Sequence, residues 1–96
     1  MKKIKTLPSV INDHWDIIAQ FDGQEHAHTD VMILAKSKTR QHFVAWSGTI
    51  NANGHLDVFS GHYSNDFVET LNDFHRRCLV LSKFCEEYNV AKEVKA

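Results

Sequence analysis

Histidine is the residue with metal-binding or catalytic potential that this sequence carries in excess, with seven among 96 residues. His26 and His28 are one residue apart, which places both imidazoles on the same side of an extended segment. His55 and His62 lie on the last predicted hairpin. Structural zinc requires four Cys or His ligands at short, paired spacings, and the sequence offers no such set. We therefore expect no metal and no cofactor, with a metal-dependent enzyme built on these four histidines as an alternative.

The two cysteines, Cys78 and Cys85, are seven residues apart. On a helix this spacing is about 10 Å along the axis, too far for a disulfide between them. Both fall on the apolar stripe of the predicted C-terminal helix, where thiols behave as small hydrophobic groups. A Cys–His nucleophile needs a thiol in a polar cleft, and His75 beside an inward-facing Cys78 does not meet that need. The acidic pairs are local neighbours at surface or cap positions, so we expect no catalytic residue.

The first part of the chain is predicted to form a β-sheet that positions several of these residues. Short runs between residues 14 and 63 either alternate polar and apolar residues or are apolar throughout, as strands do. Asn53-Gly54 is the strongest turn signal, because this pair tolerates the positive φ angles of tight hairpins. Short connections favour antiparallel pairing. The four predicted strands are His14–Phe21, Val31–Lys36, Gln41–Ile50 and Leu56–Tyr63.

The C-terminal third changes to a helical period. Apolar residues recur at alternating spacings of four and three, at Phe67, Leu71, Phe74, Cys78, Leu81, Cys85 and Tyr88. This pattern predicts one helix from about Asn65 to Asn89, about 37 Å long, with Ser64 or Asn65 as its cap. The fold class is therefore α+β: a meander of about four antiparallel strands packed against one long C-terminal helix. The chain is predicted to be a single domain, residues 1–96, with an arm (1–13), a sheet (14–63), the helix (64–90) and a tail (91–96).

Length and composition narrow the function classes. Eleven Lys and Arg against twelve Asp and Glu give a net charge of -1, which disfavours generic phosphate binding. The apolar run Val31–Ala35 is far shorter than a membrane span, and no apolar stretch of signal-peptide length follows the N-terminal lysines. Two cysteines are too few for a disulfide scaffold. These features predict a cytoplasmic protein that does not engage a membrane.

The segment Trp46–Arg77 resembles a pattern in small proteins of phages and conjugative elements. In that pattern a hairpin ending in Gly-His-Tyr runs into a helix containing Asp-Phe and a following Arg. The matching positions are Gly61, His62, Tyr63, Asp73, Phe74 and Arg77. Small α+β proteins of such elements include anti-CRISPR and other anti-defence inhibitors, so the resemblance implies that class. Many of them are strongly acidic DNA mimics, and the near-neutral charge here disfavours mimicry.

Surplus apolar residues predict an interface. One helix covers one face of a four-stranded sheet, so the other face, including Trp46, is expected to lack an internal cover and to bind a protein partner. We predict partner-binding residues at the basic turn, at the aromatic face and at the last hairpin: Lys36, Lys38, Arg40, Trp46, Asn53 and His55. The last helical turns, with Leu81, Cys85 and Tyr88, are expected to project past the sheet and to form a homodimer.

The function that these features favour is a non-enzymatic protein-binding module. With the resemblance, it becomes a phage or mobile-element inhibitor that occludes a surface of a host defence complex, which can be a nucleoprotein. The alternative of a different class is a small nucleic-acid-binding or regulatory protein that uses the basic turn Lys36–Arg40.

Overall fold

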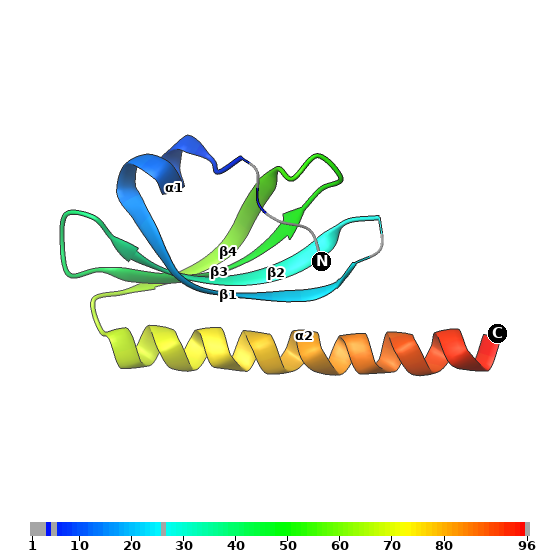
Figure 1. Ribbon diagram of the computed structural model, residues 1–96. Helices are drawn as coiled ribbons and strands as arrows, with labels where there is room; N and C mark the ends of the chain where they lie inside the picture. The colour runs from blue at the N-terminus through cyan, green and yellow to red at the C-terminus, as the bar shows by residue number, and fades with distance from the viewer. Residues whose placement is uncertain (1–3, 5, 26, 96) are drawn as a thin grey trace.

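A computed structural model describes residues 4, 6–25 and 27–95, with the side chains of 86–95 left aside (Figure 1). Four strands form one antiparallel sheet in the order β1-β2-β3-β4, and a long helix lies across one face, which confirms the predicted α+β meander. No helix in the described part of the chain has both the length and the apolar character that a bilayer crossing demands. The elements are α1 (Ser9–His14), β1 (Trp15–Glu25), β2 (Thr29–Ser37), β3 (Phe43–Ile50), β4 (Leu56–Ser64) and α2 (Phe67–Lys95).

The face of the sheet opposite α2 holds the largest hydrophobic core. Alternation along the central strands sends Ile33 of β2 and Val44 of β3 to this face, and both are fully buried. The sheet curves around the N-terminal segment and α1, which cover it (Figure 1), and Ile11 of α1 is 1 % exposed within the same cluster. The expectation of an uncovered sheet face was therefore wrong, because the segment predicted as an arm closes this face.

The arm contains a single β-bridge and a short helix. Thr6 forms a parallel bridge with His55, the residue immediately before β4. The six-residue helix α1 starts at Ser9, after Pro8, whose fixed φ suits a helix start. The backbone N–H groups of Ile11 and Asn12 both donate to the Pro8 carbonyl.

Helix α2 packs on the other face along the centre of the sheet. Leu81 is 5 % exposed and lies over Gly23 of β1, where a Cβ would approach its Cδ1 to 3.0 Å. Near the helix start, the ring of Phe67 lies 5.2 Å from that of Phe43. Phe67 and Leu81 of the predicted stripe thus face the sheet, together with Thr70, a buried residue that the apolar period does not reveal.

The boundaries of some elements differ from those expected. α2 begins at Phe67 and its backbone continues to Lys95, so residues 91–95 of the predicted tail are helical. β1 continues past its predicted end at Phe21 to Glu25, with register irregularities between Ile17 and Ala19 and between Asp22 and Glu25. A β-bulge keeps pairing in place while adding a residue to one strand, which a simple two-residue alternation does not anticipate.

Candidate functional site

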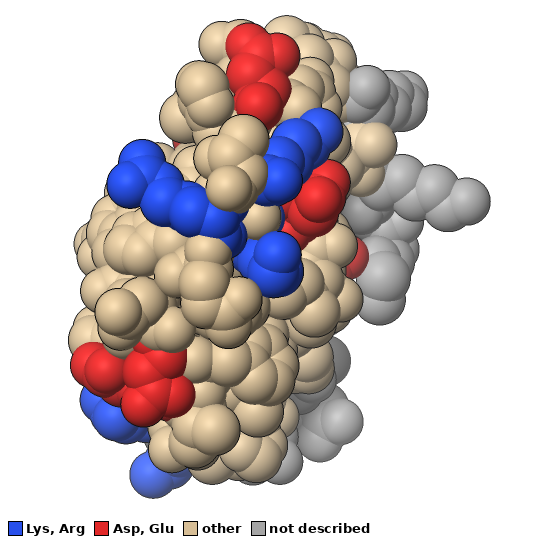
Figure 2. Space-filling model, turned by 90° about the vertical axis from the view of Figure 1, so that its left-hand side faces the viewer, with Lys and Arg blue, Asp and Glu red and all other residues tan. Residues whose placement is uncertain are grey.

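The hairpin between β2 and β3 forms a short, basic tip at the end of the molecule where α2 begins. The backbone N–H of Ser37 donates to the His42 carbonyl at 2.8 Å, which closes the loop. The N–H of Thr39 donates to Ser37 Oγ at 3.3 Å, a side-chain bond that fixes the turn. Basic side chains gather on this end, with acidic side chains beside them (Figure 2). We call Lys36, Lys38 and Arg40 the basic tip, and all three are exposed.

The basic tip has a net positive charge although the whole chain does not. Lys38 Nζ lies 3.7 Å from Asp16 Oδ1, with side chains 40 % and 69 % exposed. The N–H of Lys38 also donates to the His14 carbonyl at 2.9 Å, which ties the loop to the junction of α1 and β1. The position of the loop is thus set by the backbone, whereas an exposed ion pair of this kind contributes little stability.

Four aromatic side chains lie on the α1 face directly behind the basic tip. The rings of His42 and Tyr63 stack at 6.2 Å with an interplanar angle of 16°. Trp15 lies 5.8 Å from His42 and 5.5 Å from Trp46. Trp46 donates its indole N–H to the Tyr63 hydroxyl at 3.0 Å. The result is a ring cluster that is buried on one side and open at Tyr63, which is 52 % exposed.

The predicted partner-binding residues do not form one surface. Trp46 is 3 % exposed and belongs to the core, so it cannot itself meet a partner in this structure. Asn53 and His55 are exposed, but they lie at the β3–β4 turn, at the opposite end of the eight-residue strand β3 from the basic tip. Side-chain and backbone bonds hold that turn, where the N–H groups of both residues donate to Asn51 Oδ1.

The aromatic residues exposed at the basic tip are therefore Tyr63 and, in part, His42. Sequence reasoning did not select them as binding residues. Tyr63 comes into place because it pairs with Val44 across β3 and β4, close to the hairpin end of β3. The sequence places Tyr63 near the end of the predicted last strand. It does not give the strand register, which brings Tyr63 beside His42.

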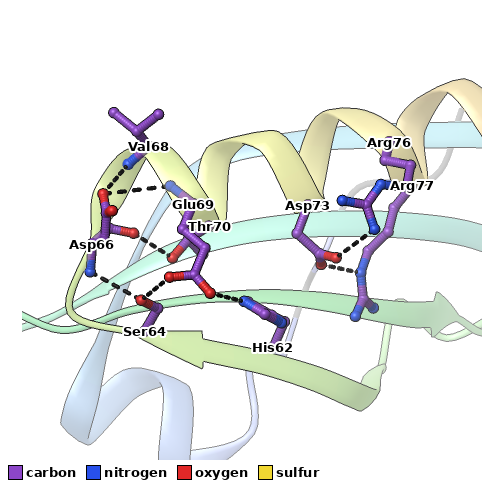
Figure 3. Close-up of polar contacts among 9 residues, drawn as sticks. All are labelled: His62, Ser64, Asp66, Val68, Glu69, Thr70, Asp73, Arg76 and Arg77. Carbon is purple, nitrogen blue, oxygen red and sulfur yellow. Dashed lines mark hydrogen bonds and ion pairs between the residues drawn. The ribbon is translucent and has the colours of Figure 1, made fainter.

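The residues of the Gly-His-Tyr motif build the end of β4. Gly61 has no room for a side chain, because a Cβ there would lie 2.7 Å from Tyr63 and 2.8 Å from Trp46 Nε1. His62 Nε2 lies 3.1 Å from Glu69 Oε1 in the first turn of α2 (Figure 3). The first two residues of this motif thus support the Trp46–Tyr63 contact and the start of the helix.

The start of α2 is capped by Asp66, not by Ser64 or Asn65. Asp66 Oδ1 accepts bonds from the N–H groups of Val68 at 3.0 Å and Glu69 at 3.4 Å. Ser64 Oγ donates to Glu69 Oε2 at 2.9 Å and accepts from the Asp66 N–H at 3.0 Å (Figure 3). Thr70, which is buried, donates its hydroxyl to the Asp66 carbonyl at 2.9 Å. These bonds fix the angle at which α2 leaves β4.

The helical part of the motif forms a polar contact between α2 and the sheet. Arg77 Nε donates to Asp73 Oδ2 at 2.6 Å, one helical turn earlier (Figure 3), and an Arg77 amino group donates to Ser47 Oγ of β3 at 2.8 Å. Arg76 lies 3.7 Å from the other Asp73 oxygen but is 73 % exposed, against 20 % for Arg77. The Asp73–Arg77 pair therefore orients the helix on the sheet.

The described histidines considered for a metal site have separate surroundings. His28 is 3.2 Å from Asp30 at the start of β2, His62 is paired with Glu69, and His55 lies at the β3–β4 turn. His26 lies outside the described residues. Among the residues that are described, no three His, Cys, Asp or Glu side chains come together as metal ligands.

The two cysteines are free and half-buried in α2. Burial raises the pKa of the Cys78 thiol above its ordinary value, as removal of water disfavours the thiolate. Cys85 Sγ accepts a bond from the Gln24 N–H at 3.2 Å. Leu81 and Cys85, predicted to project past the sheet toward a second copy, both contact β1 instead. The side chain of Tyr88, the third residue predicted at this interface, lies outside the described set.

Comparison of the chain with protein-family models, with curated proteins and with solved structures found no match.

Proposed function

We propose that this protein is a binding module that uses the basic tip and the open aromatic ring beside it to attach to an acidic surface of another protein. Following its resemblance to small phage and mobile-element proteins, it would act in the host cytoplasm as an anti-CRISPR-like inhibitor that occludes part of a defence complex. One observation carries the proposal: the exposed residues Lys36, Lys38 and Arg40 lie at a hydrogen-bonded hairpin loop next to Tyr63, which is 52 % exposed.

The positive charge of the basic tip and the exposed ring of Tyr63 both suit binding to a protein. Positive charge steers association toward an acidic patch and sets its specificity. Tyrosine supplies a large, rigid contact area with one polar group, and is enriched at protein interfaces. The ring of Tyr63 is held by Trp46 and stacked on His42, so little conformational entropy is lost when a partner covers it.

The experiment compares the capture of host proteins by matched charge-reversal variants. Arg40→Glu alone, and Lys38→Glu with Arg40→Glu, should each lower the recovery of a specific partner, the double variant more strongly. Lys83→Glu is the control, because Lys83 is also exposed but lies on α2. If Lys83→Glu and Arg40→Glu reduce capture equally, the basic tip is not the binding site.

A nucleic-acid-binding function is the second candidate, and a separate observation favours it. Stacked, solvent-facing rings beside basic side chains are a common platform for unpaired bases, and the His42–Tyr63 pair next to the basic tip has this composition. A single-stranded oligonucleotide bound at low salt, with an affinity that falls as salt rises and is lost in Tyr63→Ala, would support this function. Capture that survives nuclease treatment supports the protein partner.

A further inference from the structure

A second exposed surface follows the side of α2 that faces β4, away from the basic tip. Val80 and Phe84 of α2 are 66 % and 55 % exposed, and Phe59 of β4 is 51 % exposed. With Met32 and Gly48 they line a shallow hollow of about 310 Å³ between the helix and the edge strand. We call Phe59, Val80 and Phe84 the apolar groove. Three large apolar side chains exposed side by side mark an interaction surface more strongly than isolated ones.

Charges of opposite sign lie at the two ends of the apolar groove. Arg76, one turn before Val80, lines a second hollow of about 340 Å³ at the end nearer the helix start, with Arg77 and Asp73, so positive charge is in excess there. Asp30, beside Phe84, lies at the other end. Asp57 precedes Phe59 by two residues on the same strand face and is exposed. A surface that is basic at one end and acidic at the other complements an identical surface turned end to end.

The spacing of the exposed residues along α2 also suits a two-fold axis between two copies. Arg76, Val80 and Phe84 are four residues apart, so they form one stripe in which Val80 is equidistant from the other two. Two such stripes running antiparallel about a two-fold axis at Val80 place each Arg76 over the Phe84 ring of the other copy. An arginine over an aromatic face is a favourable pair, and the same rotation brings Arg76 toward Asp30 of the other copy.

The strand edges offer a weaker route to self-association. β4, on the edge beside the groove, has a register shift against β3, and Ser60 within it has a φ of 54°. β1, the opposite edge, has two register shifts. Irregular edges hinder the addition of a further strand.

We propose that the protein forms a symmetric homodimer through the apolar groove, with α2 of each copy antiparallel to α2 of the other and Val80 on the two-fold axis. A stable interface buries about 600–1000 Å² on each copy, which is about a tenth to a sixth of the 6179 Å² surface of this chain. This interface replaces the one predicted at Leu81, Cys85 and Tyr88. The basic tip remains outside it, so the proposal does not depend on the proposed function.

The experiment uses disulfide trapping, because only a residue on the axis meets its own copy. Val80→Cys, under mild oxidation at micromolar concentration, should give a covalent dimer joined through the two introduced thiols, identified by peptide mass. Leu79→Cys is the matched control, since Leu79 is 63 % exposed and adjacent in sequence but points about 100° away around the helix. Equal trapping of the two variants, or none in either, would overturn the proposal.

Sedimentation velocity of the unmodified protein supplies a second measurement. The wild-type chain should show a dimer mass that Val80→Lys converts to monomer, while Arg76→Glu weakens the dimer by about tenfold, as charge reversal at a close contact does. Unchanged far-UV circular dichroism keeps loss of folding separate from loss of the dimer. A wild-type monomer at several hundred micromolar overturns the proposal, and if Val80→Lys then abolishes capture of a host protein, the groove belongs to that partner.

Discussion

Arg77 of α2 reaches across the helix–sheet interface to Ser47 of β3, with 2.8 Å between the guanidinium nitrogen and the hydroxyl oxygen. Asp73, one turn earlier, holds the same guanidinium through Nε at 2.6 Å. The arginine is thus fixed from both sides, which sets the rotation of α2 about its own axis. That rotation decides which apolar residues of the helix meet the sheet and which remain exposed.

The Asp73–Arg77 pair should contribute measurably to stability. Arg77→Ala leaves the Asp73 carboxylate, which is 15 % exposed, without its closest partner, and we expect a loss of about 1–3 kcal/mol in the free energy of unfolding. Urea denaturation measures it. Arg76→Ala is the control and should cost less than about 0.5 kcal/mol, because Arg76 is largely exposed. Equal losses in both variants would show that Arg77 does not orient the helix.

Leu81 should be the apolar residue of α2 that holds the helix on the sheet. It is 5 % exposed against Gly23, so Leu81→Ala removes buried contacts and should cost about 2–5 kcal/mol. Leu79→Ala, at 63 % exposure, should stay within about 0.5 kcal/mol. Thermal or urea unfolding of the two variants tests this, and the reverse order would place a different face of α2 on the sheet.

Gly48 should not tolerate a side chain. A Cβ at this position would lie 2.6 Å from the backbone oxygen of Asp57, which cannot move without disturbing the pairing of β3 with β4. We expect Gly48→Ala to lower the free energy of unfolding, measured by urea denaturation, by about 1–3 kcal/mol. Gly23→Ala, where the nearest atom is the flexible end of Leu81 at 3.0 Å, should lower it less.

The Cys78 thiol should react slowly in the folded protein. Its raised pKa leaves less thiolate than in the unfolded chain, so alkylation at pH 8 should be slower than in urea, as peptide mass spectrometry can measure. Burial of the neutral thiol contributes its full stability below the ordinary pKa of a thiol, and this contribution falls as pH rises through the raised pKa. Cys78→Ser should lack this alkaline decline, and an identical decline in both proteins would assign it to another group.

The fold could be predicted from the sequence because the pattern of apolar residues within each strand and within the long helix indicates the type of that element. Alternation in β1 and the four-three spacing from Phe67 to Cys85 predicted the type of both elements. The cover of the second sheet face was missed because α1 has only six residues, too few for a helical period to show. Because this cover was not predicted, Trp46 was expected to lie on an exposed surface. In the structure it is 3 % exposed.

Only the part of the candidate site that is formed by neighbouring residues in the sequence could be predicted. The basic tip is one hairpin loop and can be found from Lys36, Lys38 and Arg40 alone. The ring of Tyr63 beside it depends on strand register, and the contact between Arg77 and Ser47 joins residues thirty positions apart. Asp73 and Arg77 were visible as a helical pair, but the residue that the pair would meet was not.

Different segments cover the two faces of the sheet: α1 with the N-terminal segment on one face, and α2 on the other. Mutations on one side can therefore accumulate independently of the other. Substitutions on the outer half of α2 leave the packing around Ile33 and Val44 untouched, since that core is closed by α1 and the N-terminal segment. Substitutions on the exposed side of α2 can therefore change what that side binds, while the curved sheet and the core under α1 fold as before.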